Sequence, residues 1–310
     1  MTTGLIFSDV YLEHDTGPHP ENSLRLSNTV SHFRQTGLWD RFEHLLPRAA
    51  TVEEIERAHG ADQIAFAREV AESGGGHLDG DTPVSPRSYE SAMLAAGGLF
   101  TALDSVMEGE VDNGICLVRP PGHHATPQRS MGFCLFNNIA LGAMHLRETH
   151  GLERILIADF DVHHGNGTQD IFYDDPSVLF FSLHRYPFYP GTGSASERGD
   201  GPGEGFTVNV PLPGGTSTEE YMAHFTEFVE GQAVEYDPDF ILISAGFDGY
   251  VLDPLGAFCL HGEQFKDMTL RLRDLASKVC SGRVVSTLEG GYNLNDLPKL
   301  IAAHAEGLLG

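Results

Sequence analysis

The chain is poor in cationic residues: 19 of its 310 residues are lysine or arginine, against 44 aspartates and glutamates. The formal net charge is therefore -25 at pH 7. This balance excludes direct binding to nucleic acid or to an anionic membrane, because both require a basic face. It favours attraction of cationic substrates through the field of the whole protein. A solvated acidic surface with no functional role explains the charge equally well.

Cysteines and long apolar runs are also scarce. The four cysteines are scattered and form no CxxC pair: Cys116, Cys134, Cys259 and Cys280. Buried thiols in a reducing compartment are favoured over disulfides, so we expect a cytoplasmic protein. No apolar run approaches the roughly 18 residues of a membrane span. The first residues, MTTGLIFSDVYLEHDTG, lack a basic stretch followed by a long apolar one, so we expect no signal peptide.

Short apolar strands alternate with helical segments along the whole chain. Strands are predicted at 4–8, 114–118, 154–158, 178–183, 206–210, 240–244 and 283–288. Helices are predicted at 23–36, 51–72 with a break at Gly60, 89–108, 139–149, 218–236, 263–277 and 294–308. This alternation is typical of a parallel sheet covered on both faces. No linker or change in composition divides the chain, so we predict one α/β domain over residues 1–310.

The stretch DFDVHHGNG at 159–167 follows the buried strand predicted at 154–158. Its glycines, Gly165 and Gly167, predict a loop without regular structure. In an open parallel sheet, ligands bind at the carboxyl-terminal edge, where this loop begins. Asp161 and His163 stand two residues apart, so extended geometry directs both side chains to one face. A carboxylate and an imidazole there supply two of the three protein ligands of a catalytic zinc site.

Three further strand-end loops carry reactive side chains. His123 and His124 lie in RPPGHHAT at 119–126, and Asp248 directly follows the strand at 240–244. Tyr292 follows the strand at 283–288, after a Gly-Gly pair that allows the backbone to turn. Each loop alone is more often structural than functional. Four such loops at one predicted sheet edge make chance a poor explanation.

Together these loops predict metal-assisted hydrolysis of an amide or ester. Asp161, His163 and Asp248 would form a three-ligand centre with a position left open for water, a donor set that suits zinc and iron alike. His123 or His124 would then serve as general base and later as general acid.

The remaining polar residues of these loops have supporting roles in this prediction. Asp159 and Asn166 are available to orient the two histidines. The Tyr292 hydroxyl could stabilise a tetrahedral oxyanion. His164 points away from Asp161 and His163 by strand alternation and is expected to be structural.

The motifs RPPGHHA, GFCLFNN, DFDVHHGNGTQ, SLHR, PGTG, AGFD, DPLG and LEGGYN occur in this order. They closely resemble the zinc-dependent histone deacetylase superfamily. This superfamily also includes bacterial acetoin-utilisation-type proteins and acetylpolyamine amidohydrolases. The resemblance extends from HPE at 19–21 to LEGGY at 288–292. The Pro-Pro-Gly-His-His form is similar to the class II branch and points to a class II-like bacterial deacetylase.

The resemblance implies the arginase/deacetylase α/β fold, with a central eight-stranded parallel sheet. It implies zinc on Asp161, His163 and Asp248. It also implies a role for each reactive residue. His124 would be the main general base and acid, with Asn166 facing it. His123 would be its electrostatic partner, supported by Asp159, and Tyr292 would polarise the scissile carbonyl. A structural potassium ion would take backbone oxygens of Asp159, Asp161, His163 and Leu183 and the hydroxyl of Ser182.

The same resemblance implies an acyl-lysine tunnel. Gly132 and Phe133 would form one wall, and Tyr189 the other, where the family usually has Phe. Asp81 matches a rim carboxylate that binds substrate backbone amides. Leu255 stands where polyamine-selecting eukaryotic members have Glu, so the apolar gate favours acyl-lysine in a protein or peptide.

Two other functions stay open. An acetylpolyamine amidohydrolase is compatible with the acidic surface. A non-catalytic acyl-lysine binding module is a remote alternative. A family member without catalytic activity would tolerate loss of the histidines and Tyr292, yet all of them are present in this sequence. The sequence leaves the oligomeric state open.

Overall fold

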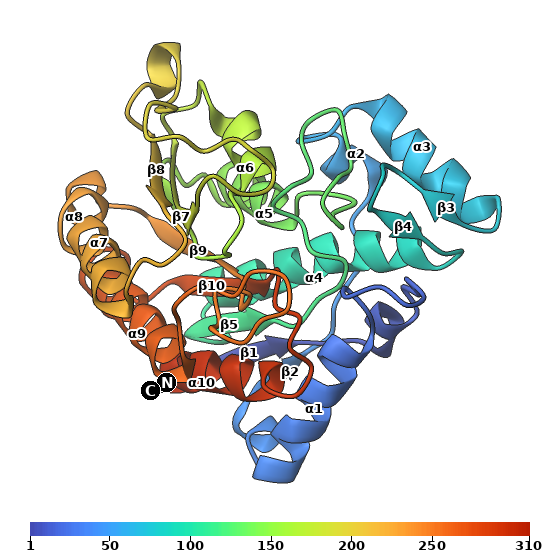
Figure 1. Ribbon diagram of the computed structural model, residues 1–310, viewed down its shortest axis with the longest axis horizontal. Helices are drawn as coiled ribbons and strands as arrows, with labels where there is room; N and C mark the ends of the chain where they lie inside the picture. Colours follow the sequence, from blue (N-terminus) through green and yellow to red (C-terminus); the bar gives the residue numbers. More distant parts are fainter.

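The computed structural model describes all residues from 1 to 310. Its centre is an eight-stranded sheet in which every neighbouring pair is parallel (Figure 1). The strand order is β2-β1-β5-β10-β9-β6-β7-β8. The strands are β1 (Thr3–Ile6), β2 (Glu43–Leu45), β5 (Asn113–Cys116), β6 (Ile155–Asp159), β7 (Val178–Arg185), β8 (Thr207–Leu212), β9 (Phe240–Ala245) and β10 (Val284–Leu288). The predicted α/β fold is confirmed.

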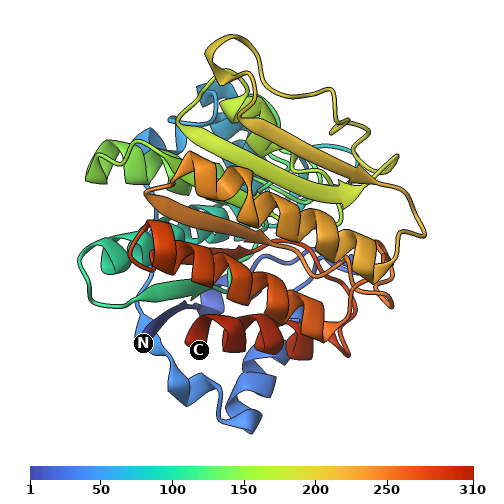
Figure 2. The same ribbon diagram turned by 90° about the vertical axis from the view of Figure 1, so that its left-hand side faces the viewer.

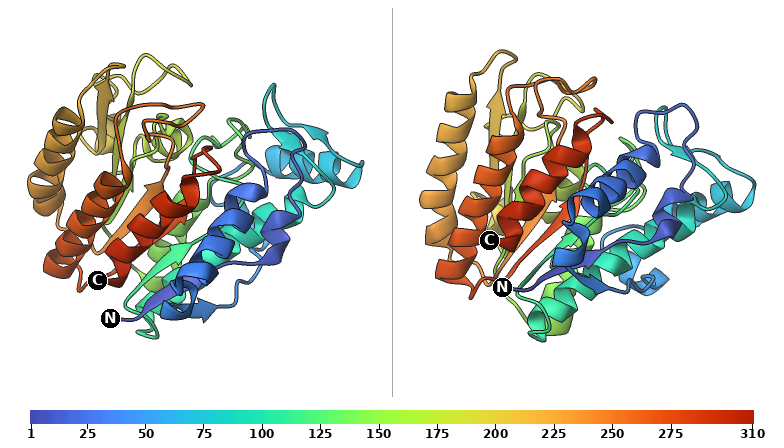
Figure 3. Two further views of the ribbon diagram at one scale, coloured as in Figure 1. Left: turned by 60° about the horizontal axis from the view of Figure 1, so that its bottom comes forward. Right: turned by 90° about the horizontal axis from the view of Figure 1, so that it is seen from below.

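Helices cover both faces of the sheet. One layer contains α1 (Leu24–Thr36), α7 (Thr218–Glu230), α8 (Gln232–Tyr236), α9 (Gly262–Val279) and α10 (Leu297–Leu309), most of it in front of the strands in Figure 2. The other layer contains α2 (Val52–Ile55), α3 (Ala61–Glu72), α4 (Ser88–Met107), α5 (Asn138–His150) and α6 (Asn166–Phe172). The two chain ends lie close together (Figure 3). None of the helices has the length and apolar character needed to cross a membrane.

The strands form because they are apolar on both faces. Every residue of β6, β9 and β10 is buried, and these strands lie side by side at the centre of the sheet. They belong to a core cluster of 60 buried residues. A smaller cluster of 14 residues packs α3 and α4 beneath a hairpin of β3 (Gly76–His77) and β4 (Pro83–Val84). A continuous apolar sequence is what a doubly covered parallel sheet requires.

Some elements differ from those predicted from the sequence. The edge strand β2 was not expected, because its sequence EHL is polar and largely exposed. The hairpin β3–β4 lies between the helices predicted at 51–72 and 89–108, where no strand was predicted. The helix predicted at 218–236 is divided into α7 and α8 at Gly231. The helix predicted from residue 51 does begin there, because Thr51 and Glu54 form a capping box at the start of α2.

The loop predicted after DFDVHH is wrong in its second half, because α6 begins at Asn166. Gly165 is the N-cap of this helix, and Gly167 lies in its first turn. A Cβ atom on Gly167 would lie 2.3 Å from the carbonyl oxygen of Ala125. Gly167 is therefore required for close packing of α6 against the loop at 119–126. It does not break the helix.

A buried ion cluster joins the N-terminal loop to the end of β10. The carboxylate of Glu21 accepts hydrogen bonds from Arg25 (3.0 Å) and Arg119 (2.7 Å), and all three side chains are fully buried. Arg25 also donates to the carbonyl oxygens of Gly291 (2.7 Å) and Glu289. Burial would raise the pKa of Glu21, but Arg119 and Arg25 outweigh burial and hold it well below its usual range.

The Glu21→Gln variant should lose about 3 to 5 kcal/mol of unfolding free energy, because it leaves two buried guanidinium groups without their shared anion. Urea unfolding followed by circular dichroism measures the loss. Glu72→Gln is the matched control, because its pair with Arg68 is exposed, and its midpoint should not move. Equal midpoints for both variants would show that the buried cluster does not stabilise the fold.

Candidate active site

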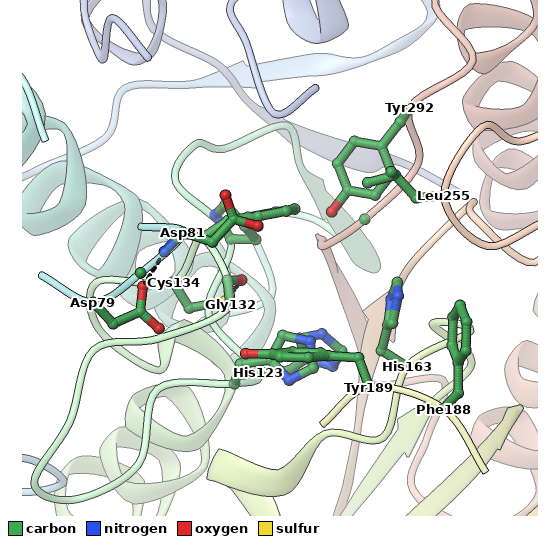
Figure 4. Close-up of a pocket in the computed structure, with 15 residues that line it drawn as sticks. Asp79, Asp81, His123, Gly132, Cys134, His163, Phe188, Tyr189, Leu255 and Tyr292 are labelled. Carbon is green, nitrogen blue, oxygen red and sulfur yellow. Dashed lines mark hydrogen bonds between the residues drawn. The ribbon is translucent and has the colours of Figure 1, made fainter. Parts of the chain in front are cut away.

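The four predicted strand-end loops meet at one edge of the sheet. They follow β5, β10, β9 and β6, which are four consecutive neighbours in the strand order. Beside them opens a pocket of about 470 Å³ (Figure 4). The pocket is lined by Asp79, Gly80, Asp81, Pro121, His123, His124, Gly132, Phe133, Cys134, His163, Phe188, Tyr189, Leu255, Gly290 and Tyr292.

Asp161, His163 and Asp248 form a compact cluster at the base of this pocket. Their ligand atoms all lie within 4.8 Å of one another. His163 Nδ1 is 3.0 Å from Asp161 Oδ1 and 3.1 Å from Asp248 Oδ2. One imidazole nitrogen carries at most one hydrogen, and Asp248 Oδ2 has no hydrogen-bond donor although it is buried. The donor set and this free lone pair fit a divalent cation.

Glycines make room for the two carboxylates of this cluster. A Cβ atom on Gly246 would lie 2.1 Å from Asp161 Oδ2, and one on Gly290 would lie 2.2 Å from Asp248 Oδ2. The Gly290 N–H instead donates to Asp161 Oδ2 at 2.9 Å. The backbone therefore approaches the carboxylates directly, which only glycine allows at these two positions.

The cluster carries an excess of buried negative charge. Burial, and then the charge of Asp161, raise the pKa of Asp248 to about 7. Burial lowers the pKa of His163, but Asp161 and Asp248 outweigh it and raise that pKa to about 10. Positive charge in contact with the two carboxylates is favourable at this position, as in metal centres.

The adjacent histidines have different hydrogen-bond partners. His123 Nδ1 donates to Asp159 Oδ2 at 2.9 Å, and His124 Nδ1 donates to Asn166 Oδ1 at 2.8 Å. Burial lowers the pKa of His123, but Asp159 and Asp161 outweigh it and raise that pKa to about 10. Burial, followed by the charge of His123, holds the pKa of His124 well below its usual value. The two rings therefore lie in different electrostatic environments, and His123 is the more basic of the two.

Glu289 is a site residue that sequence reasoning missed. Its carboxylate is fully buried and accepts hydrogen bonds from the backbone N–H groups of Gly122 (2.7 Å) and His123 (3.2 Å), and from the Ser244 hydroxyl (3.1 Å). Burial is the main cause that raises its pKa to about 7. Glu289 thus fixes the histidine loop against the ends of β9 and β10. Its position directly after a predicted strand was the available signal.

Asp253 is a second missed residue. Its Oδ1 accepts from the backbone N–H groups of Leu255 (2.9 Å) and Gly256 (3.0 Å). Its Oδ2 accepts from those of Tyr292 (2.7 Å) and Asn293 (3.3 Å). A single buried carboxylate therefore joins the loop that carries Leu255 to the loop that carries Tyr292.

Aromatic side chains form the walls of the pocket. The rings of Phe133 and Tyr292 are perpendicular, with centroids 5.8 Å apart, and Tyr292 is 7% exposed. Phe133 has a φ of 71° after Gly132, whose Cβ would meet the His124 ring at 2.5 Å. Tyr189 is half exposed at the mouth, with its ring edge-on to His124 at 5.1 Å.

Four more residues complete the mouth. Phe188, which sequence reasoning missed, stacks on His163 with centroids 5.2 Å apart. Figure 4 shows Leu255 beside Tyr292, with Asp79 and Asp81 on the opposite side of the pocket. Asp81 is exposed, and its Oδ1 is 3.4 Å from His19 Nε2.

The predicted potassium residues lie beneath this site. Asp159 pairs with Ser182 in the register of β6 and β7, and both are buried, as is Leu183. Asp159 Oδ1 accepts from the N–H of Asp161 at 3.0 Å. His164 lies apart from the pocket, with its ring nitrogens hydrogen-bonded to Thr192 and Gln169.

A family model of the histone deacetylase domain matches residues 19–308. The chain belongs to the histone deacetylase family. A probable deacetylase of Archaeoglobus fulgidus is 42% identical over 297 residues, which cover 95% of this chain and 82% of that protein. The human polyamine deacetylase HDAC10 is 40% identical over 302 residues, 94% of this chain and 44% of that protein.

The same family is recognised in three dimensions. The crystal structure of the HDA15 HD domain matches this histone deacetylase fold with a TM-score of 0.95 and 38% sequence identity, covering 100% of this chain and 89% of that chain. The resemblance read from the sequence motifs is confirmed, and so is the eight-stranded sheet that it implied.

Replacement of Asp253 by Asn should reduce the unfolding free energy by about 2 to 4 kcal/mol, because hydrogen bonds to a buried charged acceptor are lost and an amide N–H₂ faces backbone donors. Denaturant unfolding measures the change. Asp274→Asn on the exposed face of α9 is the matched control and should match the unsubstituted chain. An Asp253→Asn variant as stable as this control would contradict the linking role.

Proposed function

We propose that this protein is a zinc-dependent amidohydrolase that removes acyl groups from lysine side chains of proteins or peptides. The observation that carries the proposal is a cluster of three metal-ligand side chains whose His163 lines the same pocket as His123, His124 and the buried Tyr292. Metal-assisted hydrolysis requires these parts within reach of one bond.

Asp161, His163 and Asp248 would hold the metal through two carboxylate oxygens and Nδ1 of the imidazole. A zinc ion there would lower the pKa of a water molecule and polarise the amide carbonyl. Fe²⁺ suits the same donors. Val162 and Gly290 hold these carboxylates by backbone N–H groups, so the ligands are positioned before any ion binds.

His124 would be the main general base. Its Nδ1–H is held by Asn166, so the unprotonated Nε2 accepts the proton of the attacking water and later returns it to the leaving amine. His123, held by Asp159, which raises its pKa, would supply positive charge beside the developing oxyanion.

Tyr292 would stabilise the transition state. Burial raises the pKa of its hydroxyl well above the usual value, so the group remains a hydrogen-bond donor at neutral pH. A donor fixed in a buried pocket stabilises charge that develops on the carbonyl oxygen. The guanidinium of Arg25 lies 5.1 Å from the centroid of the Tyr292 ring and supports its position.

The remaining site residues would bind the substrate and a second cation. Gly132 and Phe133 would form one wall of the acyl-lysine tunnel and Tyr189 the other, while Asp81 binds a backbone amide at the rim. A structural potassium ion would be held by backbone oxygens and one hydroxyl, from Asp159, Asp161, His163, Leu183 and Ser182.

Acetylated polyamines are the second candidate substrates. The net charge of -25 and the rim carboxylates Asp79 and Asp81 favour a small polycation. The similarity to the human polyamine deacetylase also supports this alternative. Leu255 favours acyl-lysine, because an apolar gate offers no partner to a distal ammonium. A silent acyl-lysine binding module has least support, since the complete set of reactive side chains is present.

Tyr292→Phe should reduce kcat by about 100- to 1,000-fold, because it removes one oxyanion donor. Bound zinc should be unchanged, since Tyr292 is outside the ligand cluster. Turnover of an acetyl-lysine peptide and elemental analysis measure the two effects. Tyr236→Phe, which loses a hydroxyl at the end of α8, is the matched control and should be fully active.

Asp248→Ala provides the opposite contrast, because it should lose the zinc ion of the active site and the activity together. An active Tyr292→Phe variant would exclude its oxyanion role. Full zinc content in Asp248→Ala would exclude the proposed ligand set.

Substrate choice is tested with an acetyl-lysine peptide, N-acetylputrescine and N8-acetylspermidine assayed side by side. We expect the highest kcat/KM for the peptide. Leu255→Glu should shift the ratio of kcat/KM values toward the polyamines by about tenfold, which corresponds to about 1.4 kcal/mol for one added charge pair. Preference of the unsubstituted enzyme for polyamines would overturn the assignment to lysine and favour the alternative.

A further inference from the structure

A second group of metal-ligating side chains lies far from the pocket, between α4 and α5. His145 Nε2 and His150 Nε2 are each 2.7 Å from the same oxygen, Asp104 Oδ1. The three ligand atoms lie within 4.8 Å of one another. Asp104 lies in the last turn of α4, and His150 is the last residue of α5.

The topology places this cluster at the opposite edge of the sheet from the pocket. Helix α4 ends shortly before β5 begins, and α5 ends shortly before β6 begins. The carboxyl-terminal ends of these helices therefore lie at the amino-terminal edge of the parallel sheet. The cluster shares no residue with the active site.

We propose that Asp104, His145 and His150 form a second binding site for a divalent transition-metal ion such as Zn²⁺. Two imidazole nitrogens and a carboxylate oxygen are a donor set that suits zinc, nickel and copper. Two of the three side chains are partly exposed (Asp104 31% and His150 16%), so a water molecule has access to complete the coordination.

The surroundings of the cluster favour a cation. No protein hydrogen bond reaches Asp104 Oδ2. His145 Nδ1 is 3.3 Å from the Thr149 hydroxyl, which can accept the Nδ1–H of a ring that binds metal through Nε2. The His145 ring stacks on Phe100 with centroids 4.6 Å apart, which fixes its plane. The nearby cation Arg48 is paired with Glu54.

Binding requires a small rearrangement of the side chains. In the metal-bound form each ring carries its hydrogen on Nδ1, and Nε2 takes up the metal in place of its present contact with Asp104. Donor atoms around a tetrahedral ion with bonds of about 2.0–2.1 Å are about 3.3 Å apart, so the present contacts must widen by about 0.6 Å. The half-exposed ends of α4 and α5 permit this adjustment.

The experiment is zinc content per chain by elemental analysis, on untagged protein loaded with ZnCl₂ and desalted. We expect two equivalents in the unsubstituted chain and one in His150→Ala and in Asp104→Asn, with unchanged deacetylase activity. His224→Ala on α7 is the matched control and should hold two, because His224 is a half-exposed histidine outside both clusters.

The Asp248→Ala background separates this site from the active site. That variant should keep one equivalent, and Asp248→Ala combined with His150→Ala should hold none. Thr149→Val should weaken the remaining site of Asp248→Ala about tenfold in competition with a chelator. Zinc contents that are equal with and without His150 would overturn the proposal, whatever the result at the active site. Asp104→Asn, which preserves the size of the side chain, excludes misfolding as the cause of a loss.

Discussion

The active site depends on balancing the negative charge of several carboxylates that are buried where the central strands of the sheet end. Asp159, Asp161, Asp248 and Glu289 are all fully buried or nearly so. An uncompensated buried charge is costly, so every one of these groups requires a donor or a cation. The donors present are the His123 ring on Asp159, the His163 ring between Asp161 and Asp248, and backbone N–H groups on each carboxylate. The same contacts separate the two adjacent histidines, because they raise the pKa of His123, whereas burial and the charge of His123 lower the pKa of His124.

Much of the fold and the composition of the site were predictable from the sequence. Continuous apolar strands, as in FILIS at 240–244, predict a doubly covered parallel sheet, and such a sheet brings its strand-end loops to one edge. The residues Asp161, His163, Asp248 and Tyr292 follow from this rule. The rule does not say which strands are neighbours in the sheet. The four strands that carry the site are adjacent only because the chain crosses over between distant segments, in the order β5, β10, β9 and β6. The family resemblance supplied that information.

The errors share one physical cause, which is contact between segments far apart in the chain. Gly167 predicts a break by its local propensity, yet it lies in a helix, where glycine is required because Ala125 leaves no space for a Cβ atom. Glu289 and Asp253 look like ordinary loop acids until their backbone partners are known. Local sequence patterns do not show which distant backbone N–H group will donate a hydrogen bond to a given carboxylate. The edge strand β2 was missed for a similar reason, since only its pairing with β1 makes it a strand.

The hydrogen bonds of Asp253 have a consequence for protein engineering. One carboxylate joins the loop of Leu255, at the entrance, to the loop of Tyr292, at the reactive centre. A change in the position of one loop is therefore transmitted to the other through these hydrogen bonds. A loop exchange intended only to widen the entrance would also displace the tyrosine. New specificities on this scaffold are therefore best obtained by transplanting both loops together with their shared aspartate, or by changing side chains while that bridge is left intact.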